Sequence, residues 1–203
     1  MSIGRVADIA ITVATEGDAD VPVLRRIFDD LGLVLGPAYI ANGKGTLDKN
    51  IAGYNNAANY APWVILRDLD SDAECAPTLK EQLIAAPGTY MCFRVAVRSV
   101  ESWLMADRER LATFLSVPVA RVPGTPDELE HPKREFVNLA RRSRRRAIRD
   151  DIVPEPGTSR SVGPGYVGRI IEFAEYSWRP TIAQAVSPSL ATCVSALRRW
   201  SDE

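Results

Sequence analysis

Apolar and polar residues alternate along the first half of the chain in blocks that suit strands followed by helices. Four apolar runs rich in β-branched residues predict strands. They cover 8–15, 33–41, 62–68 and 91–98. Between them, apolar residues recur at helical spacing. The helices expected there cover 19–32, about 47–59 and about 76–86. Strands that alternate with helices predict an α/β fold with a mostly parallel sheet flanked by helices.

The second half of the chain has a different pattern. A helix is predicted over 99–115, and beyond about residue 116 no run favours a strand. Further helices are predicted over 133–151, 166–177 and 188–200, and connections rich in proline and glycine separate them. We therefore expect an α/β domain over 1–107 and a helical extension over 108–203.

Composition narrows the class of protein. Hydrophobic residues at 46% and charged residues at 25% are typical of a globular protein, and no stretch is long and apolar enough to predict a membrane span. The first residues reach acidic side chains before any signal-type cleavage site, so they are interpreted as leading into the first strand. These features predict a cytoplasmic protein without membrane contact.

Cysteine and histidine usage excludes several kinds of chemistry. Cys75, Cys92 and Cys193 are widely spaced and form no CxxC or Cys/His pattern, which argues against structural zinc and a disulfide framework. The single histidine, His131, lies in a polar stretch that favours a surface or helix-capping role. A Ser-His-Asp or Cys-His mechanism therefore has little support.

Acidic residues crowd the end of the third predicted strand. The stretch "VILRDLDSD" places Asp68, Asp70 and Asp72 at every second position. Strand alternation predicts that Asp68 and Asp70 lie on the same side of the chain, where their charges repel. A bound cation is expected to offset this repulsion.

Two further carboxylates follow predicted strands. Glu16 ends the first strand, and Glu101 comes just after the fourth. The carboxyl ends of parallel strands lie at one edge of an open sheet, so Glu16, Asp68, Asp70 and Glu101 are expected to converge. Oxygen ligands of this kind suit Mg²⁺ or Mn²⁺.

The order of these motifs resembles the Toprim domain of topoisomerases, primases and nucleases of the overcoming-lysogenization-defect type. The resemblance lies in a strand ending in Glu-Gly ("ATEGDAD") and a later strand ending in Asp-x-Asp ("VILRDLD"), within about the first half of the chain. The later "VRSVESWLMAD" is similar to a segment of small stand-alone Toprim-like proteins, some of them associated with phage defence.

The resemblance implies roles for individual residues. Glu16 matches the family's lone glutamate, a general acid/base or metal ligand, and Asp68 and Asp70 match its metal-binding aspartates. Asp20, Asp72 and Glu101 are further candidates for metal coordination. The chain has no room for the separate tyrosine-bearing domain of topoisomerases, so the resemblance implies a nuclease or another phosphoryl-transfer enzyme rather than strand passage.

Each of these acidic residues also has a purely structural interpretation. Glu16 could cap the following helix, and Asp72 could supply a negative charge near the start of the helix after it. Glu101 could pair with Arg98 or Arg108 on a helix surface. These alternatives stay open at the level of sequence.

Basic residues concentrate in the second half. Residues 133–149 carry 8 lysines and arginines and 1 acidic residue. The candidates for contact with a phosphate backbone are Arg141, Arg142, Arg144, Arg145 and Arg146, with Lys44 of the "NGKGT" turn near the sheet edge. A solvated helix that balances the acidic first half would explain the run equally well.

The sequence thus predicts a Mg²⁺-dependent nuclease, or a related phosphoryl-transfer enzyme, that acts on DNA or RNA. One alternative is a non-catalytic module that binds nucleic acid or a partner protein, for example in a defence system. Another is metal-dependent transfer on a small phosphorylated substrate.

Overall fold

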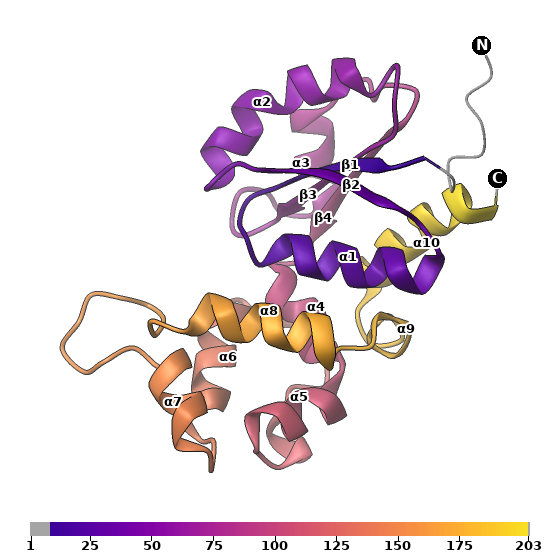
Figure 1. Cartoon of the computed structure of the whole chain (residues 1–203). Helices are drawn as coiled ribbons and strands as arrows, with labels where there is room; N and C mark the ends of the chain where they lie inside the picture. Colours follow the sequence, from indigo (N-terminus) through magenta and orange to yellow (C-terminus); the bar gives the residue numbers. More distant parts are fainter. Residues whose placement is uncertain (1–8, 203) are drawn as a thin grey trace.

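A four-stranded, all-parallel sheet lies at the centre of the computed structural model, which describes residues 9–202 (Figure 1). Its strands are β1 (Ile11–Thr15), β2 (Leu35–Ile40), β3 (Trp63–Asp68) and β4 (Met91–Ala96), in the order β2-β1-β3-β4. β3 is buried from Trp63 to Arg67, as expected of a central strand covered on both faces. The predicted α/β fold with a parallel sheet is confirmed.

Helices cover both faces of the sheet. α2 (Lys44–Ala57) and α3 (Ala76–Leu83) pack on one face, and α1 (Asp20–Leu31) and α10 (Pro188–Asp202) on the other (Figure 1). Alternate residues of β3 point to opposite layers, with Val64 and Leu66 in one core and Ile65 in the other. The predicted helices of the first half are present, and their boundaries differ by a few residues.

The second half is helical, as predicted. Its helices are α4 (Val100–Ala106), α5 (Arg108–Leu115), α6 (Pro132–Arg141), α7 (Arg146–Ile152), α8 (Tyr166–Tyr176) and the short α9 (Pro180–Ala183). The described part of the chain beyond residue 116 contains no strand. Among residues 9–202, no helix is both long and apolar enough to cross a membrane.

Two of the predicted helices are each divided into two, so the continuous helices expected over 99–115 and 133–151 are corrected. The first breaks at Asp107, whose carboxylate accepts from the backbone N–H of Arg110 and binds Arg179. The second breaks between α6 and α7, where the Ser143 hydroxyl accepts from the N–H of Arg145. In both places a side chain replaces helical hydrogen bonds.

The helical half shares one apolar core with the α1 face of the sheet. Phe136 of α6, Phe173 of α8 and Leu197 of α10 belong to the same cluster of buried side chains as Val13 and Leu66. This core is continuous across residue 107. The domain boundary expected there stays a prediction.

Asp107 links distant parts of the helical half through a buried ion pair. Its side chain is 1% exposed and accepts from Nε and Nη2 of Arg179 at 2.9 and 2.7 Å. We expect Asp107→Ala to lower the free energy of unfolding by about 2 kcal/mol, because it removes the acceptor of the backbone N–H, Nε and Nη2 of Arg179 and leaves the guanidinium with Glu109 alone, at 3.2 Å. Asp150→Ala, which removes an exposed pair with Arg146, is the matched control and should change it by less than about 0.5 kcal/mol. Urea unfolding measures both, and equal effects of the two variants would contradict the assignment.

Candidate functional site

Acidic side chains gather where the strands end. Glu16 follows β1, Asp20 begins α1, Asp68 is the last residue of β3, and Glu101 lies in α4 directly after β4. The parallel sheet brings these ends to one edge, as the sequence predicts. The four residues come close enough for their charges to interact, since Asp20, Glu101 and Glu16 all act on the pKa of Asp68.

Backbone N–H groups hold three of these carboxylates. Oε1 of Glu16 accepts from the N–H of Asp68 at 2.8 Å, and Oδ1 of Asp68 accepts from the N–H of Val100 at 3.1 Å. Oδ2 of Asp20 accepts from the N–H of Gly17 at 2.9 Å. Glu16 therefore ties β1 to β3 instead of capping the next helix.

Glu101 is held by hydroxyl groups inside the protein. It is 5% exposed, and its oxygens accept from Oγ of Ser99 at 2.6 Å and from the phenol of Tyr166 at 2.8 Å. The alternative in which Glu101 pairs with Arg98 or Arg108 on a helix surface is therefore wrong. Lys133 is the nearest cation, with its Nζ 3.8 Å from Oε1 of Glu101.

Burial and mutual repulsion make the carboxyl groups of Asp68, Asp20 and Glu16 hard to ionise. Burial, followed by the charges of Asp20, Glu101, Glu16 and Asp70, raises the pKa of Asp68 well above its usual range. Burial also raises the pKa of Asp20 to about 7, and Glu101 and Glu16 add to the effect. The pKa of Glu16 is raised mainly by burial. The cluster therefore binds protons more tightly than exposed carboxylates do.

Asp70 does not continue the strand, so the expected strand alternation of Asp68 and Asp70 is corrected. β3 ends at Asp68, and Asp70 turns into the left-handed region with φ of 47°. Its N–H donates to the carbonyl of Arg98, which fixes the turn against the residues after β4. The Asp70 carboxylate still reaches the same cavity as Asp68.

Lys44 neutralises Asp70 and Asp72. Its Nζ lies 3.2 Å from Oδ2 of Asp70 and 2.7 Å from Oδ1 of Asp72, and the hydrogen bond to Asp72 raises the pKa of the lysine. Asp72 lies apart from the Asp68 cluster, four residues before α3. Partial burial raises its pKa, but the hydrogen bonds from Lys44 and Arg67 outweigh this and leave the pKa below its usual range.

Arg67 is a structural cation that sequence reasoning missed. Its side chain is 1% exposed and pairs with Glu16 at 3.0 Å, Asp48 at 3.0 Å and Asp72 at 2.6 Å. An arginine inside the apolar run "WVILRD" was the available signal, because a buried guanidinium requires acidic partners. Arg67 thus supplies part of the positive charge that offsets the repulsion among these carboxylates.

A cavity of about 800 Å³ opens beside Asp68. Its acidic lining comes from Asp68, Asp70, Glu101 and Glu130, and its basic lining from Lys44, Arg98, Lys133 and Arg134. His131, at the start of α6, also lines it. Sequence reasoning missed Arg98, Lys133 and Arg134 as site residues. Pro132 marks where the helix begins, but no local pattern places that end of the helix at the cavity.

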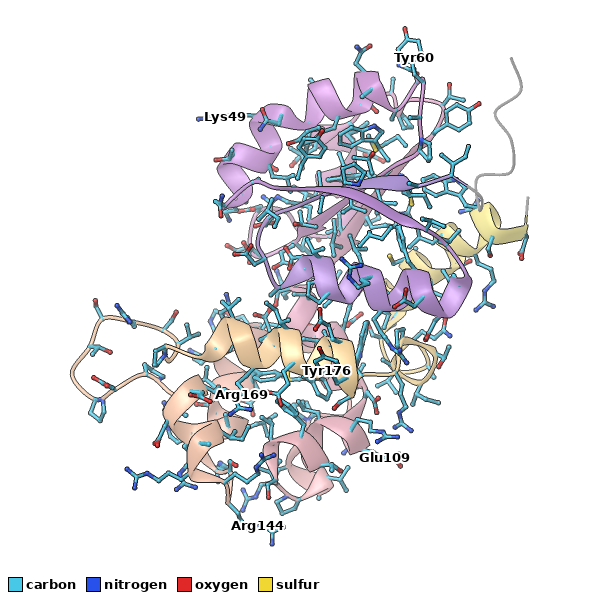
Figure 2. All side chains as sticks on the ribbon, in the orientation of Figure 1. Lys49, Tyr60, Glu109, Arg144, Arg169 and Tyr176 are labelled. Carbon is cyan, nitrogen blue, oxygen red and sulfur yellow. The ribbon has the colours of Figure 1, made fainter. Side chains whose placement is uncertain are left out.

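The arginines singled out from the sequence do not line this cavity. Arg141 ends α6, Arg142, Arg144 and Arg145 lie in the turn that follows, and Arg146 begins α7. Figure 2 shows Arg144 at the end of the molecule opposite Lys49 of α2. The basic run is therefore divided between the cavity, at the start of α6, and a separate surface at its end.

Mg²⁺ and Mn²⁺ require hard oxygen donors, which this edge of the sheet supplies as carboxylates. Among residues 9–202, no group of three histidine, cysteine or acidic side chains forms a ready-made metal site. Mg²⁺, however, is usually bound by one or two carboxylates and completes its shell with water and phosphate oxygens. The cluster of Asp68, Asp20, Glu16 and Glu101 supplies hard oxygen donors close together, and this chemistry fits such an ion.

Comparison with known proteins adds no relative: no protein-family model, no curated protein and no solved structure matches this chain.

The raised pKa of Asp20 predicts a pH-dependent stability. Its pKa lies near 7 in the folded protein and near 3.8 ordinarily, so the folded state binds the proton more tightly. This contribution to stability is complete below pH 3.8 and is lost as the pH rises to about 7. Asp20→Asn removes the ionisation and keeps an acceptor for the N–H of Gly17. At pH 8 we expect this variant to be more stable than wild type by at least about 1 kcal/mol, with the gap closing toward pH 4.

Urea unfolding between pH 4 and 8 without divalent cations measures this gap. Asp18→Asn is the matched control, because Asp18 is exposed two residues away. A gap for Asp20→Asn that does not change with pH would contradict the burial and repulsion described above.

Proposed function

We propose that this chain is a Mg²⁺-dependent or Mn²⁺-dependent nuclease. The observation that supports it best is the cavity beside Asp68, where carboxylates and four basic side chains share one space. Carboxylates are needed to hold a divalent cation, and basic side chains are needed to hold a phosphodiester. The resemblance to Toprim nucleases leads to the same chemistry.

The proposal gives each group a role. Asp68 and Asp70, with Glu16, Asp20 and Glu101 beside them, would hold the ion. The chemistry that such an ion supplies when bound is activation of water and neutralisation of charge on the phosphate. Arg98, Lys133 and Arg134 bind the phosphodiester oxygens.

Asp20 lies beside the proposed ion site, and burial raises the pKa of its carboxyl group to about 7 in the absence of metal. A bound divalent cation would favour the ionised carboxylate. Tyr166 and Ser99 orient Glu101 through the hydrogen bonds that they donate to it.

A second candidate is a binding module without catalysis. Lys44 and Arg67 already pair with Asp70, Asp72 and Glu16, and a site neutralised from within has less need of a metal ion. In this case the basic side chains bind nucleic acid or a partner, and no bond is cut. Either candidate function is compatible with a role in phage defence beside a protein partner. Only the family resemblance suggests that role.

The two candidates differ in the effect of Asp68→Asn. This variant keeps an acceptor for the N–H of Val100 and removes a repelled charge, so it should fold. If the protein is a nuclease, the rate of cleavage of labelled single-stranded or double-stranded DNA or RNA with Mg²⁺ should fall by at least about 100-fold, the scale of a lost catalytic group. Asp29→Asn, at an exposed position of α1, should cleave like wild type.

Cleavage that is abolished by chelating the metal but unchanged by Asp68→Asn would exclude this site. Binding of the oligonucleotides without cleavage by any of the proteins would favour the second candidate.

A further inference from the structure

Helix α6 connects the cavity to the separate basic surface. Its first turn, with Pro132, Lys133 and Arg134, lines the cavity, and its last residue is Arg141. Ten helical residues span about 15 Å. The two groups of basic side chains are thus the two ends of one short helix.

One face of α6 stays in solvent along this length. Phe136, Val137, Leu139 and Ala140 are buried in the apolar core. Arg134, Asn138, Arg141 and Arg142 recur at helical spacing on the exposed side, and Nη1 of Arg141 donates to Oδ1 of Asn138 at 2.9 Å. Asn138 also donates to the partly exposed Glu135 at 3.3 Å. The exposed side is therefore a polar stripe, mostly basic, that begins at the cavity.

The charges of this stripe are not neutralised within the protein. Five exposed arginines have no acidic side chain of residues 9–202 within 4.0 Å of their guanidinium nitrogens: Arg134, Arg141, Arg142, Arg144 and Arg145. Arg146 differs, because it pairs with Asp150 at 3.2 Å. Several unpaired guanidiniums in a row are suited to binding a polyanion.

We propose that a single-stranded nucleic acid lies along α6, with one phosphodiester in the cavity and the next nucleotides over the stripe as far as Arg145. The location of the cut on this strand rests on the proposed function. A cavity of about 800 Å³ takes a ligand of one or two nucleotides. An unpaired strand can enter this recess toward Asp68 and Glu101, whereas a paired strand is held away by its complement.

The mode of recognition follows from the residues of the stripe. Its exposed positions carry no aromatic side chain, so bases do not stack there and contacts go to the phosphates. Binding along α6 is therefore indifferent to sequence and strongly dependent on salt.

The test measures binding without cleavage. Fluorescent oligothymidylates of 2 and 12 nucleotides are titrated with wild type and with Arg141→Glu/Arg142→Glu in EDTA. The double variant should bind the 12-mer at least 10-fold more weakly, with a shallower dependence on salt, and should bind the 2-mer like wild type. Arg198→Glu/Arg199→Glu is the matched control, because it reverses an adjacent exposed pair on α10, and it should bind both like wild type.

Three results would overturn the path along α6. One is an equal loss in the two double variants, since that indicates a general effect of charge. Another is a 12-base-pair duplex that binds as tightly as the single strand. The third is polyglutamate that displaces the 12-mer at equal charge concentration, which indicates an acidic protein as the partner.

Cleavage with Mg²⁺ separates this inference from the proposed function. If wild type cuts the 12-mer and the Arg141→Glu/Arg142→Glu variant cuts it equally well at subsaturating concentration, the path fails and the nuclease stands. If wild type binds the 12-mer through α6 but cuts neither DNA nor RNA, the nuclease fails and the binding path stands.

Discussion

Repulsion among buried carboxyl groups at the sheet edge is the constraint on which the account of this protein depends. Asp68 is surrounded by Asp20, Glu101, Glu16 and Asp70, and burial adds to the difficulty of ionising it. Like charges in a buried cluster lower the stability of the folded state at neutral pH. A fold that keeps such a cluster at the carboxyl ends of its strands is best explained by a function for the acids.

Side chains from several other elements contact this cluster or line the cavity beside it. Arg67 gathers Glu16, Asp48 and Asp72 beneath the edge, and Lys44 holds Asp70 and Asp72 at the surface. The helical half completes the site: Tyr166 of α8 donates to Glu101, and α6 brings Lys133 and Arg134 to the cavity. The α/β half and the helical half therefore both contribute charged side chains to one cavity.

The sequence was sufficient to predict the strands, their parallel arrangement and the gathering of Glu16, Asp68 and Glu101 at one edge, because these follow from local pattern and from the geometry of parallel sheets. The breaks at Asp107 and Ser143 were missed. Asp107 ends its helix by binding Arg179, which lies 72 residues away in sequence, and no local pattern contains that pair. Tertiary contacts of this kind override the helix propensity of the local sequence.

The buried role of Glu101 was missed for the same reason, since its partner Tyr166 is 65 residues away. The concentration of basic residues over 133–149 could be recognised from the sequence alone. Its division into Lys133 and Arg134 at the cavity and the arginines from Arg141 onward at the far end of α6 depends on where the helix packs, and that is a property of the three-dimensional core.

The central claim is that the acidic cluster binds a divalent cation. Its most direct test is calorimetric titration of the wild-type protein with Mg²⁺ at pH 7 in two buffers of different ionisation enthalpy. The ion must displace protons that the raised pKa values of Asp20 and Asp68 retain, so binding should release protons and the measured heat should differ between the buffers. Asp68→Asn should bind more weakly. No detectable binding of Mg²⁺ or Mn²⁺, or binding that Asp68→Asn leaves unchanged, would contradict the account.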